Sequence, residues 1–122
     1  MKSKATNRET GSQGEQIAET YLLDSGYRIA DRNVRSVYGE IDFVAFQGDT
    51  LVFIEVKARR SSRFGLPEEA VDRRKQAKLI RLAAWYRSER FRFSGPIRFD
   101  VLAIMLKGDI PTVRLIENAI EL

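Results

Sequence analysis

Two consecutive runs of this sequence decide its fold: Gly39-Glu-Ile-Asp-Phe-Val-Ala-Phe46 and Thr50-Leu-Val-Phe-Ile-Glu-Val-Lys-Ala58. A short glycine-containing turn, Gln47-Gly-Asp49, separates them. This pattern predicts two antiparallel strands joined as a hairpin. The second run is so apolar that we expect a central strand, with both of its faces covered.

Side chains along a strand alternate between its two faces. In the first run, alternation places Asp42 on the same face as Glu40 and Val44. Ile41 and Phe43 are expected together on the opposite face. The acidic residues of this run should therefore lie on one side of the sheet.

The second run carries an acidic and a basic residue at its end. Glu55 and Lys57 are two positions apart and share a face. On adjacent strands, Asp42 and Glu55 repel each other unless one is protonated or a cation lies between them. A divalent ion bound by both carboxylates resolves this repulsion, and carboxylate oxygens suit Mg²⁺ or Mn²⁺. A buried ion pair of Lys57 with either carboxylate is the structural alternative.

The composition excludes several classes of site. The chain has no His and no Cys, so Ser-His-Asp, Cys-His and ordinary zinc sites are excluded. Its 122 residues, 43% hydrophobic and 31% charged, are typical of one soluble globular domain. No apolar run approaches the roughly 20 residues of a membrane span. The N-terminal residues do not resemble a signal peptide. We therefore expect a cytoplasmic protein without a membrane partner.

Charge is unevenly distributed along the chain. Residues 57–92 contain 12 Lys+Arg and 4 Asp+Glu, a net +8, which leaves 21 − 12 = 9 basic and 17 − 4 = 13 acidic residues elsewhere, a net −4. A basic segment after an acidic one is what a phosphate-binding surface beside a metal site requires. A solvated, arginine-rich helix face explains the charge alone more simply.

The rest of the chain supplies two helices and three further strands. Residues 1–9 are expected to form a flexible arm, and residues 10–122 a single domain of α/β class. The predicted order is αβββαββ, a small sheet with helices packed against it. Outside the hairpin, the expected elements are a helix over 10–25, a strand over 27–35, a helix over 73–90 capped by Asp72, and strands over 97–106 and 111–120.

Glu15 in the first helix has two interpretations. Ser12-Gln-Gly-Glu15 fits a capping box, in which Glu15 would accept a hydrogen bond from a backbone N–H. If Thr10 is the cap instead, Gln13 takes that role. Glu15 is then free, on the helix stripe that faces the sheet with Ala18. The sequence leaves both open.

The acidic strand pair also resembles a known family. Gly39-Glu-Ile-Asp42 followed by Val52-Phe-Ile-Glu-Val-Lys-Ala-Arg59 closely resembles the YraN family of predicted endonuclease-like bacterial proteins. That family is similar to the PD-(D/E)xK nuclease superfamily, which includes Holliday-junction resolvases and restriction enzymes. Further matching pieces are Gly14-Glu15, Asn33, Arg35, Lys75, Arg98-Phe-Asp100 and Asn118-Ala119.

The resemblance implies a restriction-endonuclease-like fold, with a central mixed sheet flanked by helices. It implies a metal-dependent endonuclease that hydrolyses phosphodiester bonds in DNA, with branched or structured DNA as one candidate substrate. Asp42, Glu55 and the carbonyl of Val56 would bind Mg²⁺ or Mn²⁺. Lys57 would orient or activate water, and Glu15 would be an auxiliary acid.

Partners follow from the same resemblance. Resolvase-like relatives act as dimers, so a homodimer is allowed. Two other classes of function remain open: a non-catalytic nucleic-acid-binding module on a nuclease scaffold, and a protein-interaction domain that docks through its basic helix. If the chain binds DNA, the basic residues expected to contact backbone phosphates are Arg35, Arg59, Arg60, Arg63 and Lys75.

Overall fold

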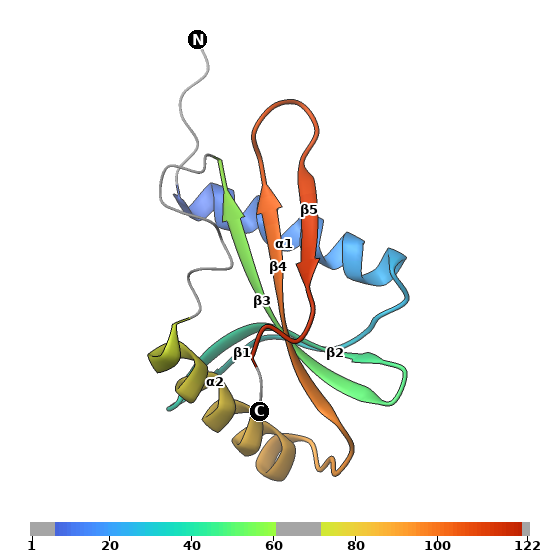
Figure 1. The fold of residues 1–122 in the computed structure, drawn as a ribbon, viewed down its shortest axis with the longest axis vertical. Coiled ribbons are helices and arrows are strands. Elements are labelled where there is room, and N and C mark those ends of the chain that lie inside the picture. Colours follow the sequence, from blue (N-terminus) through green and yellow to red (C-terminus); the bar gives the residue numbers. More distant parts are fainter. Residues whose placement is uncertain (1–6, 61–71, 121–122) are drawn as a thin grey trace.

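The computed structural model describes residues 7–60 and 72–120 of the chain. Figure 1 shows a twisted sheet with α1 crossing behind β3 and β4, and with α2 at the lower left. The elements, in chain order, are α1 (Asn7–Asp24), β1 (Arg28–Ser36), β2 (Gly39–Gln47), β3 (Thr50–Arg59), α2 (Arg73–Trp85), the π-helical turn η3 (Tyr86–Arg90), β4 (Ile97–Met105) and β5 (Thr112–Ile116).

The five strands form one mixed sheet in the order β1-β2-β3-β4-β5. The pairs β1–β2, β2–β3 and β4–β5 are antiparallel, whereas β3 and β4 are parallel. A parallel pair needs a crossover connection, and the chain between β3 and β4 includes α2. The α/β class and the predicted order αβββαββ are therefore confirmed. The division into a flexible arm and a single domain stays a prediction.

Both faces of β3 are covered, as its apolar sequence predicted. Consecutive residues Val52, Phe53 and Ile54 are each 0% exposed. Phe53 belongs to a core cluster with Leu82 of α2, whereas Val52 and Ile54 belong to a second cluster with Leu22 of α1. Burying a large apolar side chain contributes about 1.5–3 kcal/mol. The two clusters hold the sheet between α1 and α2. They therefore also fix the position of β3, which carries Glu55 and Lys57.

The helices begin and end close to their expected positions, with one informative difference. Asp72 caps α2 as predicted, because its side chain accepts a 2.9 Å hydrogen bond from the backbone N–H of Lys75. The α2 helix with η3 spans the predicted range 73–90. Helix α1 begins at Asn7, earlier than expected. Ser12 and Thr10 are therefore inside the helix, and neither is its N-cap.

The last strand is shorter than its sequence predicted. β5 ends at Ile116 rather than near residue 120. Asn118 has a positive φ of 55°, a conformation that Asn tolerates better than most residues. The N–H of Ala119 then donates a 2.7 Å hydrogen bond to the carbonyl of Phe99 on β4. The chain leaves the β5 ladder because this turn folds it back against β4.

Strand β2 departs from simple alternation at its start. Its pairing with β3 runs from Gln47↔Thr50 to Phe43↔Ile54, whereas its pairing with β1 continues to Gly39. Ile41 is buried in the α2 cluster, while Phe43 is buried in the α1 cluster. The prediction that Ile41 and Phe43 share a face is wrong, because β2 turns away from β3 just where Asp42 lies.

Candidate active site

Asp42 lies where β2 separates from β3. Its Oδ2 accepts a 2.7 Å hydrogen bond from the backbone N–H of Val56 on β3. The carboxylate thus bonds a main-chain group of the neighbouring strand beyond the last paired residues, Phe43 and Ile54. This hydrogen bond holds Asp42 beside the carboxyl-terminal part of β3, where Glu55 and Lys57 were predicted to meet it.

Glu55 is buried in the carboxyl-terminal half of β3, and its two oxygens have unequal surroundings. Oε1 accepts a 2.6 Å hydrogen bond from Nζ of Lys75 on α2. Nζ of Lys57 lies 3.2 Å from the same oxygen. Among the described residues, Oε2 is the one buried side-chain polar atom without a hydrogen-bond partner. Native proteins rarely leave such an atom unsatisfied, so a water molecule or an ion is expected at this oxygen.

The pKa values of Asp42 and Lys57 are both shifted by burial and by charged groups close to Glu55. Burial raises the pKa of Asp42 to about 6, with Glu55 and Glu15 adding to the rise and the Val56 hydrogen bond opposing it. Burial lowers the pKa of Lys57, and Lys75 lowers it further against the attraction of Glu55. The predicted repulsion between Asp42 and Glu55 is therefore present, and so is the alternative ion pair of Glu55 with Lys57.

Lys75 was expected to contact nucleic-acid phosphates from the surface, but the structure places it inside this site. Burial opposes its charge, yet its hydrogen bonds with Glu55 and Lys57 give it a raised pKa. Sequence reasoning missed this contact because Lys75 comes from a different element, 20 residues after Glu55. The only local signal was its position in the first turn of a capped helix.

Gly14 allows α1 to pack closely against Ala58, near the carboxyl-terminal end of β3. A Cβ atom at Gly14 would lie 2.6 Å from Cβ of Ala58, a separation that real side chains do not tolerate. Only glycine allows the helix to rest this closely on the strand. The next residue, Glu15, is half-buried and raises the pKa of Asp42. Since α1 begins at Asn7, the capping-box interpretation of Glu15 is wrong.

Two carboxylates and a main-chain carbonyl are the oxygen donors available to a divalent ion at this site. No group of three or more His, Cys, Asp or Glu is placed to hold a metal within the described ranges, so Glu15 does not complete such a cluster. Mg²⁺ commonly binds through one or two carboxylates and completes its coordination with water and phosphate oxygens. A cation would satisfy the unpartnered oxygen of Glu55 and the repulsion at Asp42. Asp42 and Glu55 therefore fit Mg²⁺ or Mn²⁺.

The other predicted phosphate contacts are spread around the site. Arg35 on β1 is exposed and lies opposite Glu40 on β2, with 3.4 Å between Arg35 Nε and Glu40 Oε2. Arg59 donates a 3.0 Å hydrogen bond to the carbonyl of Ala58. Arg60 hydrogen-bonds Thr10 and Gln13, which ties the end of β3 to α1. Arg63 lies outside the described residues.

A second buried carboxylate, missed by the sequence reasoning, lies on β4. Asp100 is 1% exposed and accepts hydrogen bonds from Arg98 at 2.9 Å on each oxygen. Its Oδ1 also accepts a 2.9 Å bond from the N–H of Asn118. Burial, followed by Asp100, raises the pKa of Tyr27 to about 12. The alternating Arg98-Phe-Asp100 block was the available signal, and its role is to pin the C-terminal turn to β4.

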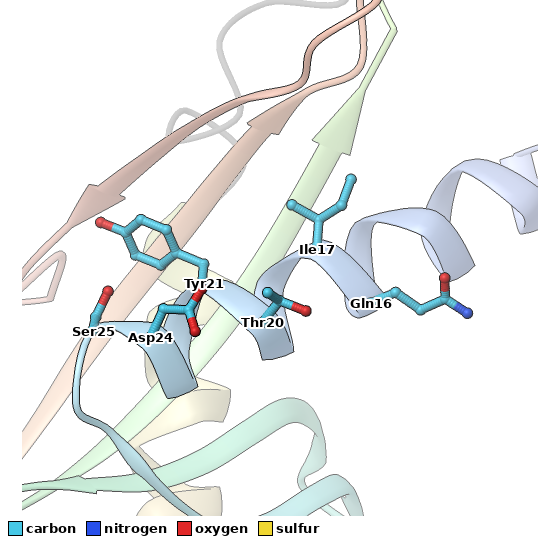
Figure 2. Close-up of a pocket in the computed structure, with 6 residues that line it drawn as sticks. All are labelled: Gln16, Ile17, Thr20, Tyr21, Asp24 and Ser25. Atoms are coloured by element: carbon cyan, nitrogen blue, oxygen red, sulfur yellow. The ribbon is translucent and has the colours of Figure 1, made fainter.

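A hollow on α1 lies apart from the carboxylates. Figure 2 shows Ile17 and Tyr21 pointing up from the helix, with Gln16 and Thr20 beside them. None of the site residues on β2, β3 or α2 lines it. We assign no chemistry to this hollow, which is lined by Gln16, Ile17, Thr20, Tyr21, Asp24 and Ser25.

Fold and site define a small α/β protein in which the neighbouring strands β2 and β3 each carry one acidic residue of a pair, Asp42 and Glu55, with Lys57 and Lys75 beside Glu55. Residues 14–104 match the model of the family described as "Uncharacterised protein family UPF0102". A UPF0102 protein of Moorella thermoacetica is 52% identical over 101 residues, covering 83% of this chain and 84% of the relative. A UPF0102 protein of Syntrophus aciditrophicus is 45% identical over 116 residues, covering 95% and 91%.

A UPF0102 protein of Symbiobacterium thermophilum is 47% identical over 114 residues, covering 93% of this chain and 97% of the relative. The chain belongs to the UPF0102 family, which is the YraN family. The predicted family membership is therefore confirmed. In the part of the chain that the structure describes, no helix is both long and apolar enough to span a membrane.

Proposed function

We propose that this protein is a metal-dependent endonuclease of restriction-endonuclease-like fold that hydrolyses phosphodiester bonds in DNA. One observation supports the proposal more than any other. The buried Oε2 of Glu55 has no hydrogen-bond partner among the described residues, and it belongs to a carboxylate within electrostatic reach of Asp42. An unsatisfied anionic oxygen beside a second carboxylate lowers stability unless a cation binds there. The arrangement is thus one suited to binding Mg²⁺ or Mn²⁺.

The chain's own residues would divide the chemistry among them. Asp42 and Glu55, with the carbonyl of Val56, would hold the ion. A bound Mg²⁺ supplies Lewis acidity toward the phosphate and lowers the pKa of a coordinated water. Lys57 would face the scissile phosphate and stabilise the negative charge that develops in the transition state. Because the pKa of Lys57 is lowered, a larger fraction of it would be the neutral amine at a given pH, and that form could take a proton from the attacking water.

DNA binding would use backbone contacts that do not read sequence. Arg35 is exposed at the β1–β2 edge next to the strand that carries Asp42, and Arg59 and Arg60 lie at the end of β3. Arg63 follows them in sequence. Arg35, Arg59 and Arg60 lie around the acidic pair, and such phosphate contacts predict binding that weakens as salt rises.

A cleavage assay with linear, flapped and branched DNA in Mg²⁺ or Mn²⁺ tests the proposal. We expect Asp42→Asn and Lys57→Met to lower the cleavage rate at least about a hundredfold while DNA binding is retained. Asp49→Asn is the matched control, because Asp49 is exposed in the turn at the other end of β3. Cleavage that survives both site substitutions would remove these residues from the mechanism.

A second candidate is a non-catalytic nucleic-acid-binding module on the same scaffold. It is favoured by the ion pairs of Glu55 with Lys75 and Lys57, which already neutralise one of its oxygens. This alternative predicts salt-sensitive DNA binding that is unchanged by divalent ions and by Glu55→Gln. Fluorescence anisotropy of a labelled duplex, measured with and without Ca²⁺, separates the two candidates.

A further inference from the structure

Two lysine amino groups converge on Oε1 of Glu55, and neither hydrogen-bonds to Oε2. Lys75 Nζ lies 2.6 Å and Lys57 Nζ 3.2 Å from Oε1, whereas Oε2 is buried without a partner in the described chain. Like charges this close repel, and the negative charge of Glu55 offsets that repulsion. A change in the charge of Glu55's surroundings would therefore release one of the two lysines.

Lys75 is the lysine that can leave. Its backbone is fixed, because the cap residue Asp72 accepts the hydrogen bond from its N–H. Its side chain is 31% exposed, compared with 18% for that of Lys57. Lys57 lies on the central strand β3, whereas Lys75 lies in the first turn of α2. The Lys75 side chain can thus turn toward solvent about a fixed backbone position, and Lys57 has less freedom to do so.

A divalent ion on Glu55 would compete directly with Lys75. The ion and the ammonium group both neutralise the same carboxylate, and they repel each other at such short range. Once displaced, Lys75 would be a cation at the edge of a site that then holds a phosphate. Lysine is a flexible point charge well suited to a phosphate contact.

We propose that Lys75 is an internal counter-cation of Glu55, which a divalent ion displaces and which then binds a phosphate of the nucleic acid. This inference rests on the proposed function, since it requires a metal ion at Glu55. It assigns Lys75 a positioning role with two states. In the metal-free chain Lys75 covers Glu55, and in the metal-bound chain it contributes to substrate binding.

The first test is Mn²⁺ binding, measured by electron paramagnetic resonance or calorimetry with Mn²⁺ alone. Removing the competing charge in Lys75→Met should tighten Mn²⁺ binding on the order of tenfold, within the usual range of couplings between sites. Lys75→Gln, which keeps a polar side chain, should behave similarly. Lys78→Met is the matched control, because Lys78 is exposed on the same helix and its removal changes the net charge equally.

The second test is binding of a labelled DNA duplex by anisotropy, with and without Ca²⁺. In Ca²⁺, Lys75→Met should weaken DNA binding. The slope of log K against log salt concentration should also become shallower by about 1, the value expected for the loss of one phosphate contact. Without a divalent ion the same substitution should have little effect, because Lys75 is then held by Glu55. Lys78→Met should show no such dependence on Ca²⁺.

The outcomes separate this inference from the proposed function. Mn²⁺ binding that is lost in Glu55→Gln and tightened in Lys75→Met, or that is detected only in Lys75→Met, supports both. Binding that is lost in Glu55→Gln but equal or weaker in Lys75→Met overturns the role of Lys75 and leaves the metal site standing. Absence of Glu55-dependent Mn²⁺ binding in the wild type and in Lys75→Met overturns both.

Discussion

Two buried carboxylates lie on neighbouring strands of this sheet, and their surroundings differ sharply. Asp100 on β4 accepts hydrogen bonds on both oxygens from Arg98, and Oδ1 also accepts one from the backbone of Asn118. Glu55 on β3 has two lysines at one oxygen and, within the described residues, no partner at the other. A fully bonded carboxylate holds the fold together, whereas a partly bonded one still has capacity for a ligand.

The two carboxylates also face different helices. Leu102, which alternates with Asp100 along β4, packs in the α1 cluster, and Phe53, which alternates with Glu55 along β3, packs in the α2 cluster. The sheet therefore separates a structural network on one side from a site that couples β2, β3 and α2 on the other. Substitutions in the two regions should have opposite consequences for stability and for metal binding.

The largest effect on folding is expected from Asp100→Ala. This change leaves the half-buried guanidinium of Arg98 without its main partner and frees the Asn118 turn, which should cost about 3 kcal/mol in the free energy of unfolding. Urea unfolding measures it. Mn²⁺ affinity of the folded variant should equal that of the wild type. A loss below about 1 kcal/mol would show that the Asp100 network does not hold the fold as we describe.

Asp42→Asn should act in the opposite direction and stabilise the fold. The pKa of Asp42 is raised to about 6 in the folded chain, so the folded state binds a proton that the unfolded state has already lost. As pH rises from about 4 to about 6, the wild type should lose about 3 kcal/mol relative to Asp42→Asn, and the difference should persist above pH 6.

Urea unfolding of the wild type and of Asp42→Asn at pH 4.5 and pH 8 checks whether the substitution raises the free energy of unfolding as predicted. Asn keeps an oxygen that can accept the Val56 hydrogen bond, so the comparison isolates the buried charge. Asp49→Asn serves as the exposed control. A variant no more stable than the wild type at pH 8 would contradict the rise in the pKa of Asp42 that its burial, with smaller contributions from Glu55 and Glu15, produces.

A smaller effect is expected where α1 rests on the active-site strand. Gly14→Ala forces Cβ against Ala58 and should cost about 1–2 kcal/mol through overpacking. Gly11→Ala, in the same helix but with no atom within 4 Å of the added Cβ, should gain up to about 1 kcal/mol in helix propensity. Thermal unfolding of both variants makes the comparison. Equal changes in stability at the two positions would contradict the close approach of α1 to β3 at Gly14.

The smallest effect is expected at an exposed carboxylate beside the site. Glu40 pairs with Arg35 at 3.4 Å, but both side chains are exposed. Glu40→Gln should therefore change the free energy of unfolding by no more than about 0.5 kcal/mol and should leave Mn²⁺ affinity unchanged. A marked loss of Mn²⁺ binding in calorimetry would mean that the metal site extends along β2 to Glu40.

Much of this contrast could be predicted from local sequence pattern. The hairpin and the cap at Asp72 were correct because short-range spacing determines both. The period of two placed Glu55 and Lys57 side by side, as found. Asp42 was expected on the same side, which stays a prediction; its carboxylate accepts a hydrogen bond from the backbone of β3.

The remainder depends on contacts between distant segments. Lys75 reaches Glu55 from a separate helix, and Asn118 reaches Asp100 from beyond β5. No local spacing encodes either approach. Alternation failed at Ile41 because strand twist and the separation of β2 from β3 depend on the whole sheet. The satisfied and unsatisfied carboxylates look alike in sequence for this reason.

Anomalous diffraction from a crystal soaked in Mn²⁺ tests the central claim most directly. The account predicts one strong anomalous peak within coordination distance of Asp42 and of Glu55 Oε2, with the Lys75 ammonium moved away from Glu55. Diffraction that shows no peak at these carboxylates in saturating Mn²⁺, with Lys75 and Lys57 still on Oε1, would contradict it.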